Sequence, residues 1–448
     1  MAAAASERIS GERSLRPLGG VLAAMAVSLT GTRISAIALP WFVLATTGSA
    51  TRTGLVAFCE MVPYVVAKAF TGPLVDRAGP RSVSWVTDVV SASAVGAVPL
   101  LHALDMLSFW PLLVLVAVIG AARGPGDLAK EVMVPEAAER ALIPLERAAG
   151  LTGVTERLAA TVGPAIGGAT VALVGPLAAL TADAVCFASG SVIIALALPR
   201  RSAHVSPAAE GPPEPGYWSR FGDGFRFLRQ EPLLLTITVT VGILNLLDAA
   251  FSTLLMPVWA RESGHGPSVI GLTGSVLGIA AVGGSLIAAA VAHRMRRRLV
   301  FFGGFLVAGA PRFLVLAAGA PMWAVLAVFA ASGFGMGFLN PILGAITFER
   351  VPRPLLGRVN ALGDSLAWAG IPLGGLIAGA GVASFGLTAV LLVAAAAYVL
   401  TTTVTALRPQ WREMDRVRAS GSTPAPGLAP APAPATEQGP DPLTRTEP

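Results

Sequence analysis

The sequence has few charged residues, which make up 13% of its 448 residues, whereas hydrophobic residues make up 54%. A soluble domain carries about 25% charged residues, so most of this chain is expected to be solvated by lipid. Spanning a bilayer takes about 20 apolar residues per helix, and the chain has room for about a dozen such runs. The composition therefore predicts an all-α polytopic membrane protein.

Lysine and cysteine are also scarce. The two lysines, Lys68 and Lys130, are not followed by Ser or Thr, which excludes a Walker phosphate-binding loop. Cys59 and Cys186 both lie inside apolar runs and give neither a disulfide framework nor a metal spacing. HExxH and GxSxG motifs and clustered His/Asp at metal spacing are missing as well. We expect no cofactor, no metal and no enzymatic activity.

The apolar runs predict twelve transmembrane helices, at 18–44, 53–75, 82–104, 109–130, 147–173, 176–199, 232–260, 268–292, 299–318, 321–347, 358–383 and 385–407. We expect kinks where proline interrupts a run, at Pro40, Pro63, Pro257, Pro311 and Pro372. The predicted domains are an N-terminus (1–17), a six-helix bundle (18–199), a linker with an interfacial helix (200–231), a second six-helix bundle (232–407) and a disordered tail (408–448).

The two predicted bundles carry a repeat. A shift of 217 residues places Arg81 on Arg298, and after the loop that follows the fourth helix the shift becomes 211, which places Arg147 on Arg358. Pro40 and Pro257, Gly54 and Gly271, Gly120 and Gly337, and Gly163 and Gly374 coincide in the same registers. Two parallel six-helix halves are therefore expected.

Basic residues predict the orientation. If the N-terminus is cytoplasmic, most of the 32 Lys and Arg residues fall on the cytoplasmic side, and outside it the loops hold only Arg52 and Arg261. This asymmetry predicts an even number of spans with both termini cytoplasmic. The net charge of +6 is thus explained by topology and does not indicate a nucleic-acid partner.

The short polar joint between the second and third predicted helices reads Gly72-Pro-Leu-Val-Asp-Arg-Ala-Gly-Pro-Arg81. It resembles the signature loop G-x-L-x-D-R-x-G-x-R of the major facilitator superfamily. The matching residues, and the predicted conformational switch, are Gly72, Leu74, Asp76, Arg77, Gly79 and Arg81. In the second half His293 stands in the place of Asp76, so any switch that needs the carboxylate belongs to the first half.

The fifth predicted helix carries Gly163, Pro164, Gly167 and Gly168. These residues resemble the glycine-proline signature of helix 5 in the superfamily's antiporters. Small residues also let helices pack closely in lipid, so tight packing without any bearing on transport direction is the alternative.

Ionisable groups inside a membrane are costly and usually functional. The candidate proton- or substrate-binding residues are Arg33, Glu60, Arg123, Asp127, Glu156, Arg157, Asn245, Asp248 and Asn340, and further membrane carboxylates are Asp88, Asp183 and Asp364. Arg33 and Glu60 lie at similar depth and are expected either to pair structurally or to bind substrate or protons. Glu60 is our first choice as the proton carrier.

The resemblance implies the major facilitator fold and its twelve-helix drug, macrolide and siderophore efflux branch. It implies a monomeric secondary transporter of the inner (plasma) membrane that exchanges protons for an amphiphilic small molecule by alternating access. A proton-coupled importer is the alternative with the same fold, and a polytopic membrane enzyme is a more distant one.

Overall fold

The computed structural model describes residues 14–198, 225–291, 297–351 and 356–408. Within these ranges the side chains of a few residues, among them Asp76, Asn340 and Asp364, lie outside the description. The linker 200–224, His293 and the predicted tail from residue 409 also fall outside the described residues.

The first half consists of helices α2 (Arg16–Thr47), α3 (Ala50–Phe70), α4 (Gly72–Ala78), α5 (Pro80–Ala103), α6 (Phe109–Ala141), α7 (Leu145–Val174) and α8 (Pro176–Ala197). Local chemistry sets several of the ends. Gly48 ends α2 with a positive φ of 64°, and the Ser49 side chain then accepts a hydrogen bond from the Arg52 backbone N–H and caps α3. Gly79, with a φ of 79°, makes the turn between α4 and α5.

The second half consists of α10 (Pro232–Ala250), the π-helical turn η1 (Phe251–Leu255), α11 (Met256–Glu262), α12 (Ser268–Val291), α13 (Arg297–Ala308), α14 (Ala310–Ala317), α15 (Met322–Arg350), α16 (Leu356–Trp368), α17 (Ile371–Phe385) and α18 (Leu387–Leu407). Three of the five expected kinks coincide with breaks: Pro257 follows the π-helical turn, and Pro311 and Pro372 follow interruptions of the helix. Pro40 and Pro63 lie inside the continuous helices α2 and α3.

Each of the twelve predicted spans is covered by one helix or by consecutive helices. Eleven of the described segments are long and apolar enough to cross a membrane. The remaining predicted span is α3, whose apolar run is interrupted by Arg52, Glu60 and Lys68. Helix α3 packs against α6 of its own half and against α17 of the other half, so two helices cover parts of it.

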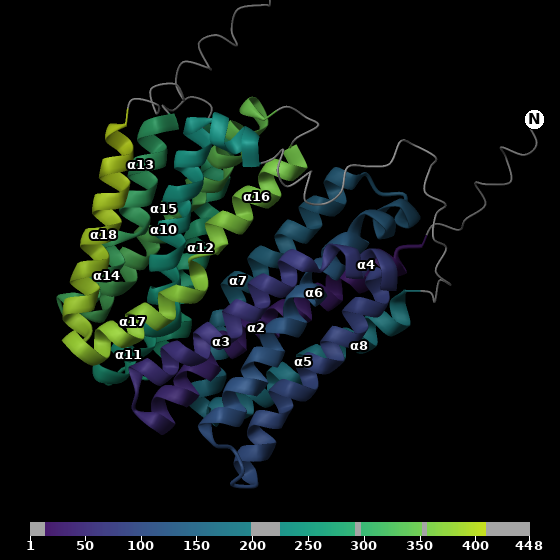
Figure 1. Ribbon diagram of the computed structural model, residues 1–448, viewed down its shortest axis with the longest axis horizontal. Coiled ribbons are helices and arrows are strands. Elements are labelled where there is room, and N and C mark those ends of the chain that lie inside the picture. The colour runs from purple at the N-terminus through teal and green to yellow at the C-terminus, as the bar shows by residue number, and fades with distance from the viewer. Residues whose placement is uncertain (1–13, 199–224, 292–296, 352–355, 409–448) are drawn as a thin grey trace, which may run out of the picture.

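The two halves form separate bundles that approach each other at one end of the molecule (Figure 1). We call this the hairpin end, where α2 ends and α18 begins, and the opposite end, where α2 begins and α18 ends, the terminal end. At the hairpin end α3 packs on α17, and α7 packs on α12. The Thr51 hydroxyl donates to the Gly379 carbonyl at 3.4 Å, and the Arg261 guanidinium donates to the Leu44 carbonyl. Toward the terminal end the bundles diverge (Figure 1).

The helices of the two halves pack in matching pairs. In the first half α3 packs on α6 and α5 on α8, and in the second half α12 packs on α15 and α14 on α18. One hydrogen bond is repeated at the atomic level: Arg81 Nη2 donates to the Ala195 carbonyl at 2.8 Å, and Arg298 Nη2 donates to the Ala406 carbonyl at 2.6 Å. These partners are related by the same shifts of 217 and 211 residues that relate the two halves in the sequence.

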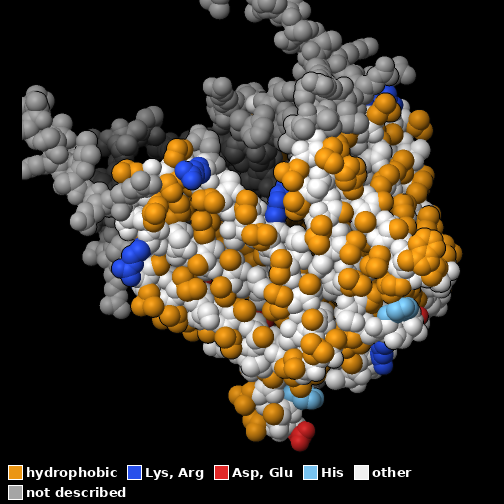
Figure 2. Space-filling view, turned by 180° about the vertical axis from the view of Figure 1, so that it is seen from behind, with side chains coloured by type: hydrophobic (Ala, Val, Ile, Leu, Met, Phe, Trp, Pro, Cys, Tyr) orange, Lys and Arg blue, Asp and Glu red, His pale blue; other side chains and the backbone are white. Residues whose placement is uncertain are grey.

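Apolar side chains fill both bundles and also cover their outside. The larger buried cluster lies in the second half around Phe251, Phe301 and Phe313, and another in the first half surrounds Val95 and Phe187. Hydrophobic and uncharged side chains dominate the face shown in Figure 2, with few charged ones between them. A surface of this kind fits a lipid surrounding.

Candidate functional site

The main polar cluster of the first half lies between α3 and α6, and glycines bring these helices together. A Cβ atom at Gly120 would stand 2.0 Å from the Glu60 carbonyl oxygen, and one at Gly124 would stand 2.7 Å from the Tyr64 carbonyl oxygen. Two glycines four residues apart on one helix face allow such close packing. The contact places Arg123, which lies between them, next to Glu60 and Tyr64.

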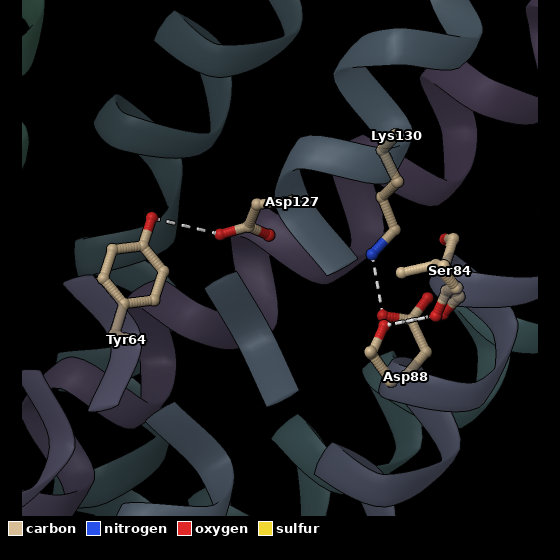
Figure 3. Close-up of polar contacts among 7 residues, drawn as sticks. Tyr64, Ser84, Asp88, Asp127 and Lys130 are labelled. Carbon is tan, nitrogen blue, oxygen red and sulfur yellow. Dashed lines mark hydrogen bonds and ion pairs between the residues drawn. The ribbon is translucent and has the colours of Figure 1, made fainter. Parts of the chain in front are cut away.

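Arg123 and Glu60 form an ion pair within this cluster. Arg123 Nη1 lies 2.8 Å from Glu60 Oε1, and the two side chains are 11% and 16% exposed. The guanidinium also lies over the Tyr64 ring, 4.6 Å from its centroid. The Tyr64 hydroxyl in turn donates to Asp127 Oδ2 at 3.4 Å, as Figure 3 shows. Four side chains from two helices, one of them a cation and two of them acids, thus form one connected network.

Of the two alternatives for Arg33 and Glu60, the structural pair is wrong, because Glu60 is bonded to Arg123. Arg33 lies on α2 with an exposed side chain. The charges of Arg123 and Asp127 act on it, so it belongs electrostatically to the same cluster. Glu156 of α7 is also among its electrostatic neighbours. The arrangement joins these candidate residues into one charged region, whereas Arg157 lies on the exposed surface of α7.

A second ion pair, which the sequence did not predict, lies deeper in the first half. Lys130 Nζ of α6 lies 2.7 Å from Asp88 Oδ1 of α5, and the two side chains are 3% and 2% exposed. Figure 3 shows the two side chains directed toward each other beside Ser84. No sequence spacing relates α5 to α6 closely enough to have indicated this pair.

The candidates of the second half make different contacts. Arg312 Nη2 of α14 lies 2.6 Å from Asp248 Oδ1 of α10, and Arg312 is buried. The Asn245 side chain donates to the Ala367 carbonyl of α16 at 3.0 Å, which joins two helices of the same half. Asn340 lies in α15, and its side chain is outside the described residues.

Aromatic and basic side chains also meet across the two halves. The rings of Tyr64 in α3 and Trp368 in α16 stack with centroids 6.5 Å apart, and the Lys68 ammonium lies 5.2 Å from the Trp368 ring centroid. Lys68 also lies 3.4 Å from Glu131 of α6. The charged region of the first half therefore reaches the second half through Tyr64 and Lys68.

The glycines of the predicted helix 5 motif lie at close helix contacts. A Cβ atom at Gly163 would stand 2.6 Å from the Arg33 Cβ, and one at Gly167 would stand 3.0 Å from the Ile34 Cα. A Cβ atom at Gly168 would stand 2.8 Å from the Gly271 Cα of the second half. A Cβ atom at Gly274, in the same helix α12 as Gly271, would stand 3.0 Å from the Pro164 Cβ. The motif thus joins α7 both to α2 and to the opposite half.

The predicted switch loop is a short helix, α4, followed by the turn at Gly79. Its residue Arg81 bonds the end of α8 through the Ala195 carbonyl, and Leu74 and Arg77 are exposed. The side chain of Asp76, like Gly72, lies outside the described residues, so its predicted role stays a prediction.

This combination of two matching helix bundles, a lipid-exposed apolar surface and charged pairs between the helices defines a multi-pass membrane transporter. The family model described as "Transmembrane secretion effector" matches residues 19–440. The chain therefore belongs to this family of the major facilitator superfamily and is a transporter rather than an enzyme, which confirms the resemblance found in the sequence.

Named relatives cover most of the chain. It is 32% identical over 401 residues to "Multidrug efflux pump Tap" of Mycobacterium tuberculosis, covering 88% of this chain and 94% of that protein. It is 31% identical over 405 residues to the pump of the same name from Mycolicibacterium fortuitum, covering 89% and 97%.

Solved structures share the fold at low sequence identity. The nucleoside transporter NupG superposes with a TM-score of 0.68 at 15% identity, covering 90% of this chain and 99% of that one. A bacterial homologue of the human lysosomal transporter Spinster gives a TM-score of 0.63 at 13% identity, covering 91% and 98%. The all-α major facilitator fold is confirmed.

Proposed function

We propose that the protein exports amphiphilic small molecules from the cytoplasm, drugs or natural products among them, in exchange for protons and by alternating access. The relatives named as multidrug efflux pumps, at 32% and 31% identity over nearly the whole chain, support export of drug-like compounds. The observation that carries the proposal furthest is the network of Glu60, Arg123, Tyr64 and Asp127 in the first half. Charged groups inside a membrane are costly and usually mark sites that bind substrate or protons.

The chemistry of this network suits an amphiphile. The Tyr64 and Trp368 rings offer flat apolar faces, while Arg33, Glu60 and Asp127 offer charges of both signs. A ligand with an aromatic body and a polar or charged end could meet both within one region. An ion pair such as Arg123–Glu60 could also open when a proton or a charged substrate competes for one partner.

The contacts between the halves support a rocking motion. The halves pack together at the hairpin end through small residues such as Gly168 and Gly271, and they diverge at the terminal end (Figure 1). We assign the terminal end to the cytoplasm because the loops there carry most of the basic residues. This conformation would then open inward, and substrate would leave after the contacts at the hairpin end have parted.

Transport measured in everted membrane vesicles tests the proposal. When the vesicle interior is made acidic, export by wild-type protein appears as ethidium accumulation inside the vesicles, and an uncoupler abolishes it. Accumulation only in right-side-out vesicles would identify an importer, and accumulation that the uncoupler does not change would exclude proton coupling. A susceptibility panel in an efflux-deficient host, with and without the uncoupler, extends the test to further compounds.

Asp76→Asn tests the switch loop in the same vesicles. We expect normal amounts of protein in the membrane but no accumulation, because the amide has lost the charge that would dock on a helix N-terminus. Asp105→Asn is the matched control, since Asp105 is an exposed residue of a turn at the hairpin end and has a positive φ that Asn tolerates. Wild-type accumulation in the Asp76 variant would remove this carboxylate from the mechanism.

A further inference from the structure

Asp183 of α8 is a buried carboxyl group that the charged network does not include. Its side chain is 1% exposed, and neither carboxyl oxygen has a hydrogen-bond partner among the described residues. The side chain of Ser35 in α2 interacts with this carboxyl group, but the two do not meet hydrogen-bond geometry. A Cβ atom at Gly31 would stand 2.4 Å from Asp183 Oδ1, so the carboxyl group packs directly onto the backbone of α2.

The charges around Asp183 do not neutralise it. The charged groups that act on it are Arg123 of α6 and Glu60 of α3, which are bonded to each other. Cys186 of its own helix adds a thiol. Charged groups also lie on the helices that pack on α8. Asp88 of α5 is already bonded to Lys130, and Arg81 of α5 bonds the Ala195 carbonyl. Arg33 of α2 and Glu156 and Arg157 of α7 are exposed.

An ionised carboxylate buried without a partner is very costly, and such a group takes up a proton instead. The ion pairs of the buried Asp88 and the half-buried Asp248 show how this protein stabilises other acids inside its bundles. Asp183 has no such cation among the described residues, so the uncharged acid is the form that fits this packing. The carboxyl group is therefore suited to hold one proton while α2 and α8 stay in contact.

The repeat shows that the two halves differ at the position of this acid. The shifts of 217 and 211 residues relate Gly31 to Asp248, Val95 to Arg312, and Asp183 to Ala394. In the second half this corner between helices carries the ion pair Asp248–Arg312 at 2.6 Å. In the first half the position of the arginine holds Val95, which is fully buried. The acid at this corner of the first half thus lacks the cation that the acid at the equivalent corner of the second half has.

We propose that Asp183 is a proton-binding site of the transport cycle, loaded in this conformation and unloaded when the rocking of the halves admits water between α2 and α8. On unloading, the O–H bond of the carboxyl group breaks, its electron pair stays on the carboxylate, and the proton passes to water admitted between the helices. Arg123 is the nearby cation that would stabilise the charge left behind. This inference rests on the proposed proton-coupled export.

Infrared difference spectroscopy of the purified full-length protein tests the site without any transport. The carbonyl stretch of the protonated acid should be present in wild-type protein, shift in D₂O, and disappear in Asp183→Asn. Asp248→Asn is the matched control and should retain the band, because Asp248 is ion-paired. A wild-type spectrum without such a band, or an Asp183 variant that retains it fully, would overturn the assignment.

Proteoliposomes test the role in coupling. We expect Asp183→Asn to bind ethidium like wild-type protein but to lose its accumulation against a gradient, because the amide can neither take up nor release a proton. If ethidium accumulation by wild-type protein does not depend on the pH gradient, the proposed proton coupling is wrong. If wild-type accumulation follows the gradient and the variant matches it, only the assignment to Asp183 fails. If the Asn variant does not fold, two other measurements decide whether Asp183 holds the proton. The wild-type infrared band should disappear at alkaline pH, and it should be absent from Asp183→Ala.

Discussion

Replacing Lys130 by methionine should destabilise the protein strongly, because it leaves the Asp88 carboxylate buried without its cation. Lys130 and Asp88 are 3% and 2% exposed and lie 2.7 Å apart. Asp88 Oδ2 has no hydrogen-bond partner among the described residues, so Lys130 provides the main stabilising contact of this carboxyl group. Methionine has nearly the length of the lysine side chain and leaves little cavity, so the charge is the principal change.

The expected size follows from burial. Removing one partner of a buried ion pair costs about 3–5 kcal/mol. Arg140→Met, on the same helix α6, is the matched control, since Arg140 and Glu136 form a partly exposed pair four residues apart. Such helix pairs contribute about 0.2–0.5 kcal/mol. The two substitutions should therefore differ about tenfold in their effect on the free energy of unfolding.

The measurement is the free energy of unfolding in mixed micelles of dodecyl maltoside and sodium dodecyl sulfate, followed by tryptophan fluorescence. The double variant Asp88→Asn/Lys130→Met removes both charges and should recover most of the loss, giving a coupling energy of about 2 kcal/mol or more in a double-mutant cycle. A loss below about 1 kcal/mol in the single variant, the range of an exposed pair, would refute the reasoning. Equal losses in the single and double variants would refute it as well.

Three further sets of substitutions test other contacts. Gly168→Leu should separate the halves at the hairpin end, because a Cβ there would already lie 2.8 Å from a backbone carbon of the other half; spin-label distances across that end should lengthen, and unchanged distances would contradict this. Arg81→Ala and Arg298→Ala should each cost about 1.5–3 kcal/mol of unfolding free energy, as a charged hydrogen bond does, and clearly unequal losses would argue against equivalent roles. Glu60→Arg should abolish vesicle accumulation, and adding Arg123→Glu should restore part of it if the ion pair itself matters; no recovery would assign a separate role to Glu60.

The helices were predictable because apolar run length sets a membrane span. The structure has a helix in every predicted span, and the repeat register found in the sequence is the one that relates the hydrogen bonds of Arg81 and Arg298. The expected kinks at Pro311 and Pro372 coincide with the breaks that divide two spans into α13 and α14 and into α16 and α17. Proline shows where a helix can break, but packing decides whether it does, as the continuous helix at Pro40 demonstrates.

The partners within the site were less predictable. Position along a helix gives the depth of a charged residue, and on that basis a pair between Arg33 and Glu60 was one of two alternatives. Depth does not give the rotation of the helix about its axis, and the glycines of α6 turn Arg123 toward Glu60 instead. Gly120 and Gly124 were the available signal, since two glycines four residues apart mark the face that approaches another helix.

The repeat explains why related halves can have different chemistry. Duplicated bundles need the same packing, and this requirement preserves contacts such as the bonds of Arg81 and Arg298 to their neighbouring helix ends. The packing does not require the same charges at the equivalent corners, where one half holds Asp248 with Arg312 and the other holds Asp183 beside α2. An ion pair resists protonation, whereas a lone buried acid favours it. In a transporter that must both keep each bundle packed and move a proton, the ion pair at one corner could serve the packing and the lone acid at the other could carry the proton.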